Sequence, residues 1–181
     1  MHSQAMIHGD LKGVWVQTLV SALPSDFFGK ANILITENCH ACLADFRLPT
    51  LLLDPTNPLA SSYSENVRTP QWTSPELLNS EQDNQPTVES DSYALGMVIL
   101  EVLSGHVPFE QFGRQSVIIK VIGGKRPERP NGPEGAWFTD NLWEMLTLCW
   151  ESQPESRPSI AAILELLEQV SGTWEPLSTE Q

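Results

Sequence analysis

Four polar residues in the first quarter of the chain have the types and the order that phosphoryl transfer requires. This reaction needs an aspartate to orient the attacking hydroxyl, a lysine to neutralise the transferred phosphate, and an asparagine with a second aspartate to hold Mg²⁺. The segments with such residues are His8-Gly9-Asp10-Leu11-Lys12, Asn32 before an apolar run, and Asp45-Phe46-Arg47. We therefore consider Asp10, Lys12, Asn32 and Asp45 as candidate catalytic residues.

Motifs farther along the chain continue this series. They are Gln71-Trp72 followed by Ser74-Pro75-Glu76, then Ser90-Asp91-Ser92-Tyr93-Ala94-Leu95-Gly96, Pro108-Phe109, Cys149-Trp150, Pro154 and Arg157-Pro158. Each motif is short, but in this order and spacing they resemble the catalytic half of the protein kinase family. The resemblance runs from His8 to about Val170. Within the family, Lys12 is typical of the serine/threonine type, while Trp72 and the closing segment resemble the tyrosine-kinase-like branch.

The resemblance implies catalytic roles for four residues. Asp10 would accept or orient the proton of the substrate hydroxyl, and Lys12 would contact the transferred phosphate. Asn32 and Asp45 would bind Mg²⁺, so ATP and Mg²⁺ are the implied cofactors. The implied activity is ATP-dependent phosphoryl transfer to serine or threonine of protein substrates.

Five further residues would be structural. Glu76 and Arg157 would form a buried ion pair that anchors the activation segment, and Asp91 would brace the catalytic loop through its backbone. His8 and Phe46 would stack in an apolar spine. Rupture of such a buried ion pair leaves an unpaired charge, which costs about 3–5 kcal/mol.

The same resemblance predicts a mainly α fold with a short β-hairpin, which is the kinase C-lobe with the N-lobe absent. Seven residues precede His8, too few for the glycine-rich loop, strand lysine and helix glutamate that hold the ATP phosphates. We expect a partial kinase domain over residues 1–170 and a frayed tail over 171–181. This chain alone is expected to be weak or inactive, because ATP would face water. The alternative is a non-catalytic, pseudokinase-like binding scaffold.

An insertion divides the expected catalytic loop. Asn32 follows Asp10 by 22 positions where the family pattern has five, and removing residues 14–30 restores that spacing. Our hypothesis is that these 17 residues are a retained intron of 51 nucleotides, since a valine codon begins with GT and a lysine codon can end with AG. The alternative is a true surface insertion, because the entropy of loop closure grows slowly with length.

Two substitutions inside the motifs bear on activity. Arg47 replaces the glycine of Asp-Phe-Gly, where a Cβ restricts the backbone and a long cation could compete with the metal. Gly9 replaces the arginine of His-Arg-Asp, which would pair with an activation-loop phosphate, for example on Thr69. We expect Gly9 to lower regulation more than activity.

Hydrophobic spacing predicts the elements that position these residues. Residues 32–36 and 41–44 are apolar runs around a turn, which predicts a β-hairpin. Residues 91–104, Val102 included, are apolar on nearly all faces, which predicts a helix buried at the domain centre and ended by Gly105. A further short helix is predicted around 117–122. Another is predicted after Thr139, with Leu142, Leu146, Cys149 and Trp150 on one face, and a third after Ser159, with apolar residues at helical spacing: Ile160, Ile163, Leu164, Leu167 and Val170. Residues 48–86 show no sustained periodicity.

Composition limits the partners. The 181 residues carry 10 Lys and Arg against 23 Asp and Glu, a net charge of −13. Nucleic acids and anionic membranes repel such a chain, and no apolar run approaches the roughly 20 residues of a membrane span. Three cysteines and no signal-peptide pattern favour a cytoplasmic protein. The sequence does not specify a protein substrate or scaffold partner, although a bare inter-lobe face would favour association.

A zinc site is an alternative interpretation of the cysteines. Cys39, His40 and Cys42 could combine with Cys149 as a Cys₃His site. Neighbouring residues of a strand point to opposite faces, however, which would separate His40 from the cysteines. A hairpin turn with ordinary thiols is therefore the favoured interpretation.

A small basic cluster also has two interpretations. Lys125, Arg126 and Arg129 are three of the ten basic residues and lie among prolines. They could dock an acidic partner, but a solvated proline-rich turn is the simpler explanation.

Overall fold

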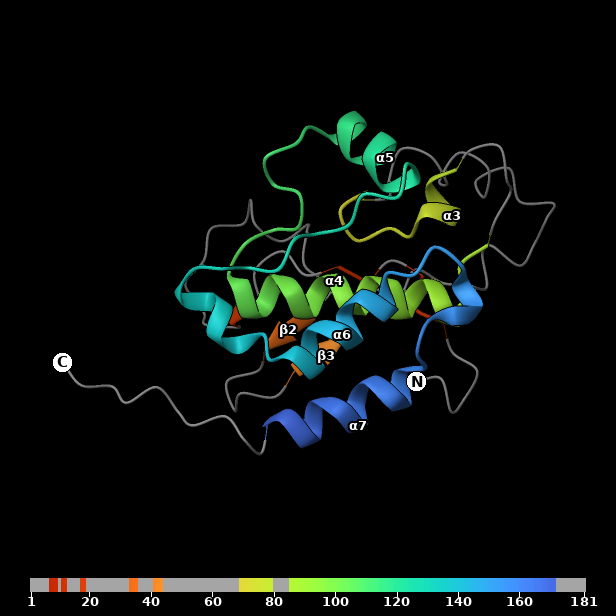
Figure 1. Ribbon diagram of the computed structural model, residues 1–181. Coiled ribbons are helices and arrows are strands. Elements are labelled where there is room, and N and C mark those ends of the chain that lie inside the picture. The colour runs from red at the N-terminus through yellow and green to blue at the C-terminus, as the bar shows by residue number, and fades with distance from the viewer. Residues whose placement is uncertain are drawn as a thin grey trace.

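Helices form most of the described structure (Figure 1). The computed structural model describes residues 7–9, 11–12, 17–18, 33–35, 41–43, 69–79 and 85–171. The helices are α3 (Pro75–Leu78), α4 (Val88–Ser104), α5 (Arg114–Ile122), α6 (Asp140–Cys149) and α7 (Ile160–Ser171), with 3₁₀ turns η3 (Pro133–Trp137) and η4 (Pro154–Ser156). The prediction of a mainly α fold with a short hairpin is confirmed. No helix in these ranges is both long and apolar enough to cross a membrane.

The short sheet precedes the helices in the chain. β2 (Ile33–Ile35) and β3 (Ala41–Leu43) pair antiparallel, with Ile33 opposite Leu43, so the predicted hairpin is confirmed. β1 (Gln17–Thr18) pairs parallel with β2 and places Gln17 opposite Leu34. Because β1 falls within residues 14–30, part of the expected insertion adds an edge strand to the hairpin.

α4 is the central helix, and its ends are set by local chemistry. The Thr87 Oγ1 accepts the Ser90 N–H at 3.2 Å, and the Ser90 Oγ accepts the Thr87 N–H at 2.9 Å. This capping box starts the helix at Val88, three residues before the predicted start. Gly105 ends it with φ 71°, the left-handed conformation that favours glycine.

α6 packs closely against α4 at Gly96. A Cβ at Gly96 would lie 2.8 Å from both the Cys149 Cβ and the Trp150 Nε1, so glycine permits this approach. The predicted inward face of α6 is confirmed: Leu142, Leu146 and Cys149, together with Trp150 after the helix, are almost fully buried. Thr139 caps α6 as predicted, since its Oγ1 accepts the Leu142 N–H at 3.3 Å.

Two expectations about buried positions are wrong. Val102 in the last turn of α4 is 52% exposed, and Leu164 on α7 is 55% exposed. The sequence pattern identifies apolar residues but not whether a neighbouring element covers them, and isolated apolar side chains are common on surfaces. The described residues of the aperiodic range 48–86 include the helix α3, which begins at Pro75 after Ser74.

Arg126 is bound to the protein rather than solvated. Its Nε donates to the Trp150 carbonyl oxygen at 2.6 Å, and its Nη1 donates to the Val121 carbonyl oxygen at 3.0 Å. These bonds join the end of α5 to the end of α6, where carbonyl groups have no helical partner. The prediction of a solvated turn is therefore wrong for this residue.

Candidate functional site

The carboxylate of Asp91 holds the backbone of the motif near the start of the chain. Asp91 lies in the first turn of α4 and is 4% exposed. Its Oδ2 accepts the His8 N–H at 2.7 Å, and its Oδ1 accepts the Gly9 N–H at 2.9 Å. The N-terminal end of a helix also favours a carboxylate, because its unpaired N–H groups carry partial positive charge. The motif is thus fixed to the central helix by both oxygens of one buried side chain.

The backbone at Gly9 is suited to glycine. Its φ is 75°, and a Cβ at this position would lie 3.1 Å from the Pro86 Cβ. A residue with a side chain would be strained in this conformation and would also displace Pro86. The structure therefore explains glycine at the position where the resemblance expects arginine.

A small pocket lies between this motif and residues 69–77. Its lining residues are Gly9, Leu11, Lys12, Thr69, Trp72, Thr73, Ser74, Leu77, Ser90, Asp91 and Ala94. Lys12 lines the pocket and is 6% exposed, so this wall is largely shielded from water. The opposite wall is held by the Trp72 Nε1, which donates to the Glu101 Oε2 at 2.9 Å, and by the Thr73 Oγ1, which donates to the Thr69 carbonyl oxygen at 2.9 Å.

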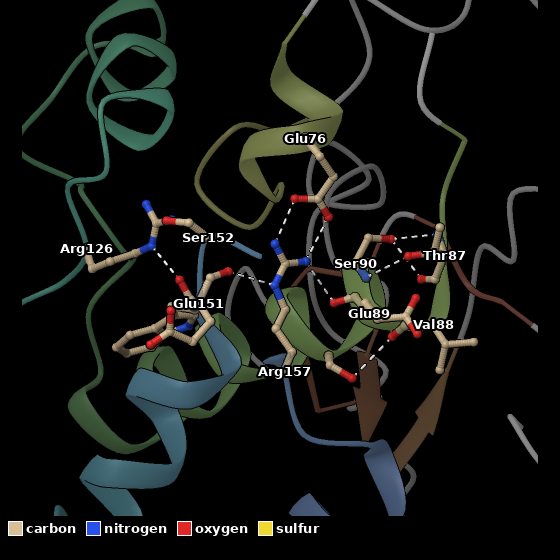
Figure 2. A network of polar contacts seen from close by, with 11 residues as sticks. Glu76, Thr87, Val88, Glu89, Ser90, Arg126, Glu151, Ser152 and Arg157 are labelled. Carbon is tan, nitrogen blue, oxygen red and sulfur yellow. Dashed lines mark hydrogen bonds and ion pairs between the residues drawn. The ribbon is translucent and has the colours of Figure 1, made fainter. Parts of the chain in front are cut away.

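An ion pair joins that second wall to the helices. The Arg157 Nη1 and Nη2 each donate to one Glu76 carboxylate oxygen at 2.7 Å (Figure 2). The same guanidinium donates to the carbonyl oxygens of Glu89 at 3.1 Å and Glu151 at 2.9 Å. Its face packs on the Tyr93 ring, with the Arg157 Cζ 5.2 Å from the ring centroid. One arginine therefore connects α3, the start of α4 and the segment after α6.

Two pKa values follow from this environment. Burial raises the pKa of Glu76, but the hydrogen bonds and positive charge of Arg157 outweigh burial, so the pKa of Glu76 is lowered overall from 4.5. Burial raises the pKa of Tyr93, against the opposing charges of Arg126 and Arg157. Glu76 is therefore ionised and Tyr93 neutral at neutral pH.

The sequence matches a known protein family over most of its length. The family described as "Protein tyrosine and serine/threonine kinase" matches residues 28–167. The chain belongs to the protein kinase family. The described part of this kinase, with its helices and short hairpin, has the architecture of the kinase C-lobe, as predicted from the sequence.

Individual kinases are similar over most of the chain. The dual specificity protein kinase pyk3 of Dictyostelium discoideum is 32% identical over 170 residues, which is 93% of this chain and 12% of the relative. A probable LIM domain-containing serine/threonine-protein kinase of the same organism is 28% identical over 171 residues, 94% of this chain and 22% of the relative. The tyrosine-protein kinase Src64B of Drosophila melanogaster is 29% identical over 148 residues, 80% and 25% respectively. The chain thus spans a quarter or less of the length of these relatives.

The structure brings together part of the set of kinase residues expected from the sequence. Lys12 and Asp91 line the pocket, and Asp91 binds the backbone N–H of His8. Glu76 and Arg157 form an ion pair with each other. His8 is 2% exposed, in accord with an internal position. The other expected residues, Asp10, Asn32, Asp45 and Phe46, lie outside the residues that the structure describes.

Two residues that shape the candidate site were not identified from the sequence. Glu101 is an acidic residue in an otherwise apolar stretch of α4, and it accepts the Trp72 indole N–H. An acidic residue in a buried helix needs a polar partner, and this is the sequence signal that could have indicated its role. Thr87 starts α4 and so fixes the position of Asp91. A Thr-x-x-Ser pattern before an apolar run could have indicated this cap, although the more usual pattern ends in Glu or Gln.

Cys149 is not placed as a metal ligand. Its thiol is buried and lies 3.5 Å from the Met145 Sδ. Burial raises the pKa of the Cys149 thiol to about 12, so the thiol is protonated at neutral pH. Among the residues described, no three His, Cys, Asp or Glu side chains gather into a metal site. Cys39 and His40 lie outside the described residues.

Replacing Asp91 with asparagine is expected to lower the free energy of unfolding by about 1.5–3 kcal/mol. The amide nitrogen of asparagine would face one of the two N–H donors, so at least one hydrogen bond is lost. Faster amide hydrogen exchange at His8 and Gly9 should accompany the loss. Asp140→Asn is the matched control, since Asp140 lies in the first turn of α6 with 93% exposure and should change stability by less than about 1 kcal/mol. Equal effects of the two variants would contradict the prediction.

Proposed function

We propose that this chain is the C-lobe of a protein serine/threonine kinase and that it carries the catalytic loop for phosphate transfer from ATP to a hydroxyl group of a protein substrate. The observation that carries the proposal is the pair of hydrogen bonds from the His8 and Gly9 N–H groups to the buried Asp91 carboxylate. Asp10 is the next residue in the chain. An anchor on the two preceding residues is what a loop needs to present an aspartate in a fixed position.

Lys12 supports the same proposal. It lines the same pocket as Thr73 and Ser74 and has little exposure to water. In such surroundings a positive charge stabilises developing negative charge more strongly than it would in water. We propose that Lys12 contacts the transferred phosphate there and that Asp10 orients the substrate hydroxyl. Mg²⁺, held by Asn32 and Asp45 in this proposal, would supply further charge neutralisation.

Full activity is proposed to require an N-lobe from a longer product. The 181 residues contain no glycine-rich loop or strand lysine of the kinase pattern, and they span a quarter or less of the kinases compared above. Without these groups the nucleotide phosphates lack much of their electrostatic stabilisation. We therefore propose that the 181-residue chain alone has weak or no phosphotransfer activity.

Phosphotransfer from labelled ATP with Mg²⁺ to a generic basic protein substrate tests the proposal. For the 181-residue chain we expect the same rate as for its Asp10→Asn variant. For a longer product that includes an N-lobe and lacks residues 14–30, we expect Asp10→Asn to lower kcat by about 10²–10⁴-fold. The exposed Asp140→Asn change should have no effect in the longer product.

Two outcomes would contradict the proposal. Turnover by the 181-residue chain well above its Asp10→Asn variant would show that the N-lobe is dispensable. A folded longer product with no turnover above that of its Asp10→Asn variant and of a blank without protein would instead support the non-catalytic scaffold.

A further inference from the structure

Ser152 is an exposed serine whose hydroxyl contacts a positive charge. It lies in the bend that follows α6, and the Arg126 Nη2 donates to its Oγ at 3.2 Å. Figure 2 shows the Ser152 side chain beside the Arg126 guanidinium. Among the serines and threonines that the structure describes, no other hydroxyl accepts a hydrogen bond from a lysine or arginine side chain. Ser152 is therefore set apart from the other exposed hydroxyl groups.

The Arg126 guanidinium is fixed in place, but all its partners are neutral groups. Its Nε donates to the Trp150 carbonyl oxygen at 2.6 Å, and its Nη1 donates to the carbonyl oxygens of Val121 and Lys125, each at 3.0 Å. Its face packs on the Tyr93 ring, with the Arg126 Cζ 5.7 Å from the ring centroid. Within the described residues, no carboxylate pairs with this guanidinium. A rigid guanidinium without an anionic partner favours an anion that can reach it.

The geometry of this contact suits a phosphate on the Ser152 Oγ. The Arg126 Nη2 carries two N–H groups, and the Ser152 Oγ is the single acceptor that the described structure gives it. A phosphate would add three acceptor oxygens just beyond the serine oxygen. One of these can accept from Nη2 while Nε and Nη1 keep their carbonyl partners. Such a charge-assisted bond is roughly twice as strong as the present bond between a cation and a neutral hydroxyl.

Exposed acidic residues flank Ser152 in the sequence. Glu151 precedes it and Glu155 follows it by three positions, and both are exposed. No lysine or arginine lies within four positions of Ser152 on either side. An enzyme that binds this segment needs a surface of complementary charge, which here means a basic one. The segment therefore fits a serine kinase whose substrate groove is basic, which we call an acid-directed serine kinase.

We propose that Ser152 is a phosphorylation site for an acid-directed serine kinase and that Arg126 binds the resulting phosphate. In the transfer, the Ser152 Oγ forms a bond to the γ-phosphorus of ATP, and the bond from that phosphorus to the bridging oxygen breaks. ADP leaves, and the hydroxyl proton passes to a carboxylate base of the acid-directed kinase and then to water. The phosphate then joins the end of α5 to the segment after α6. Because a separate enzyme performs the transfer, the proposal does not depend on the catalytic activity of this chain.

Phosphorylation of the folded 181-residue chain tests the site. The chain is incubated with ATP, Mg²⁺ and an acid-directed serine kinase, and the phosphate is located by mass spectrometry. We expect phosphate on Ser152 and its loss in Ser152→Ala. Glu155→Gln should slow the incorporation by about tenfold, because it removes a charge that the basic groove binds. Glu165→Gln, the same change at an exposed position of α7, should leave the rate unchanged.

Titration by ³¹P NMR tests the role of Arg126. Phosphoserine is incorporated during synthesis, at position 152 in one sample and at position 156 in the other. Ser156 is the matched site, because it is exposed, adjoins Glu155 and has no cationic partner among the described residues. The second pKa of phosphoserine is about 6. A bond to Arg126 favours the dianion, so the pKa at position 152 should be lower than at position 156 by about 0.5 or more. Arg126→Gln should remove this difference.

Either part of the proposal can be overturned. The absence of phosphate on Ser152 after incubation with the acid-directed kinase would show that this serine is not a modification site. Equal phosphate pKa values at positions 152 and 156 would show that Arg126 does not bind the phosphate. This second comparison uses the native Arg126, so it holds even where Arg126→Gln does not fold.

Discussion

Replacing Arg157 with methionine is expected to lower the free energy of unfolding by about 3–5 kcal/mol. Methionine keeps an apolar chain of similar length but removes the guanidinium. Glu76 then loses two hydrogen bonds of 2.7 Å and its cationic partner, in a position where its side chain is only 17% exposed. The carbonyl oxygens of Glu89 and Glu151 lose a donor at the same time. Urea unfolding followed by circular dichroism measures the change.

Two variants separate the effect of charge from that of geometry. Arg157→Lys keeps the positive charge but cannot donate in parallel to both Glu76 oxygens, so an intermediate loss is expected. Lys125→Met removes a cation whose partner Glu128 is exposed, and the expected change is less than about 1 kcal/mol. In a Glu76→Gln background, Arg157→Met should cost less, because no charge is left behind. A loss below about 1 kcal/mol in the native background would show that this ion pair contributes no more to stability than an exposed surface ion pair does.

The same ion pair makes the loss of stability in Arg157→Met depend on pH. The pKa of Glu76 is lowered in the folded protein from 4.5, so the unfolded chain binds the proton more readily. The stabilisation is therefore complete above about pH 4.5 and is lost as the pH falls through the folded pKa. The difference in unfolding free energy between the native chain and Arg157→Met should shrink as the solution is acidified through this range. A difference independent of pH would contradict the role of the Glu76 charge.

Local sequence chemistry was sufficient to predict most of the helix ends. Thr139 and Gly105 act at the ends of their helices through contacts within a few residues, and such contacts are visible in the sequence. The start of α4 was placed too late because its capping box uses Ser90 rather than Glu or Gln. The burial of each face was less predictable. Val102 and Leu164 fit helical patterns but are about half exposed, and only the tertiary arrangement reveals this.

The candidate site depends on contacts that no local pattern encodes. Glu76 and Arg157 are separated by 81 positions, and Asp91 is 83 positions from His8. Their partnership was expected only because the ordered motifs resemble those of a family. Arg126 lies outside those motifs, and its bonds to the ends of two helices were missed. Resemblance therefore predicted the long-range pairs of the motifs, while pairs specific to this chain required the structure.

Replacing Gly96 with valine is expected to destabilise the protein by about 3 kcal/mol, and Gly96→Ala by about 1–2 kcal/mol. Two effects oppose each other here. Alanine in the middle of a helix is favoured over glycine by about 1 kcal/mol, because glycine loses more backbone entropy on folding. The new Cβ, however, would lie 2.8 Å from the Cys149 Cβ and from the Trp150 Nε1. Over-packing of a core typically costs about 1–3 kcal/mol, which exceeds the gain.

The over-packing effect dominates because the neighbouring atoms have little room to move. The Cys149 Cβ is attached directly to the backbone of α6, and Trp150 is 1% exposed and in edge contact with Trp143. Relief of the clash would require α4 and α6 to move apart, which would open voids along their interface. Gly113→Ala is the matched control, because a Cβ there has no atom within 4 Å and the change should remain within about 1 kcal/mol. Urea unfolding at a constant m-value measures these changes. If Gly96→Ala left stability unchanged or raised it, the two helices would be able to separate at little cost. The close approach at Gly96 would then not be what fixes the position of α6.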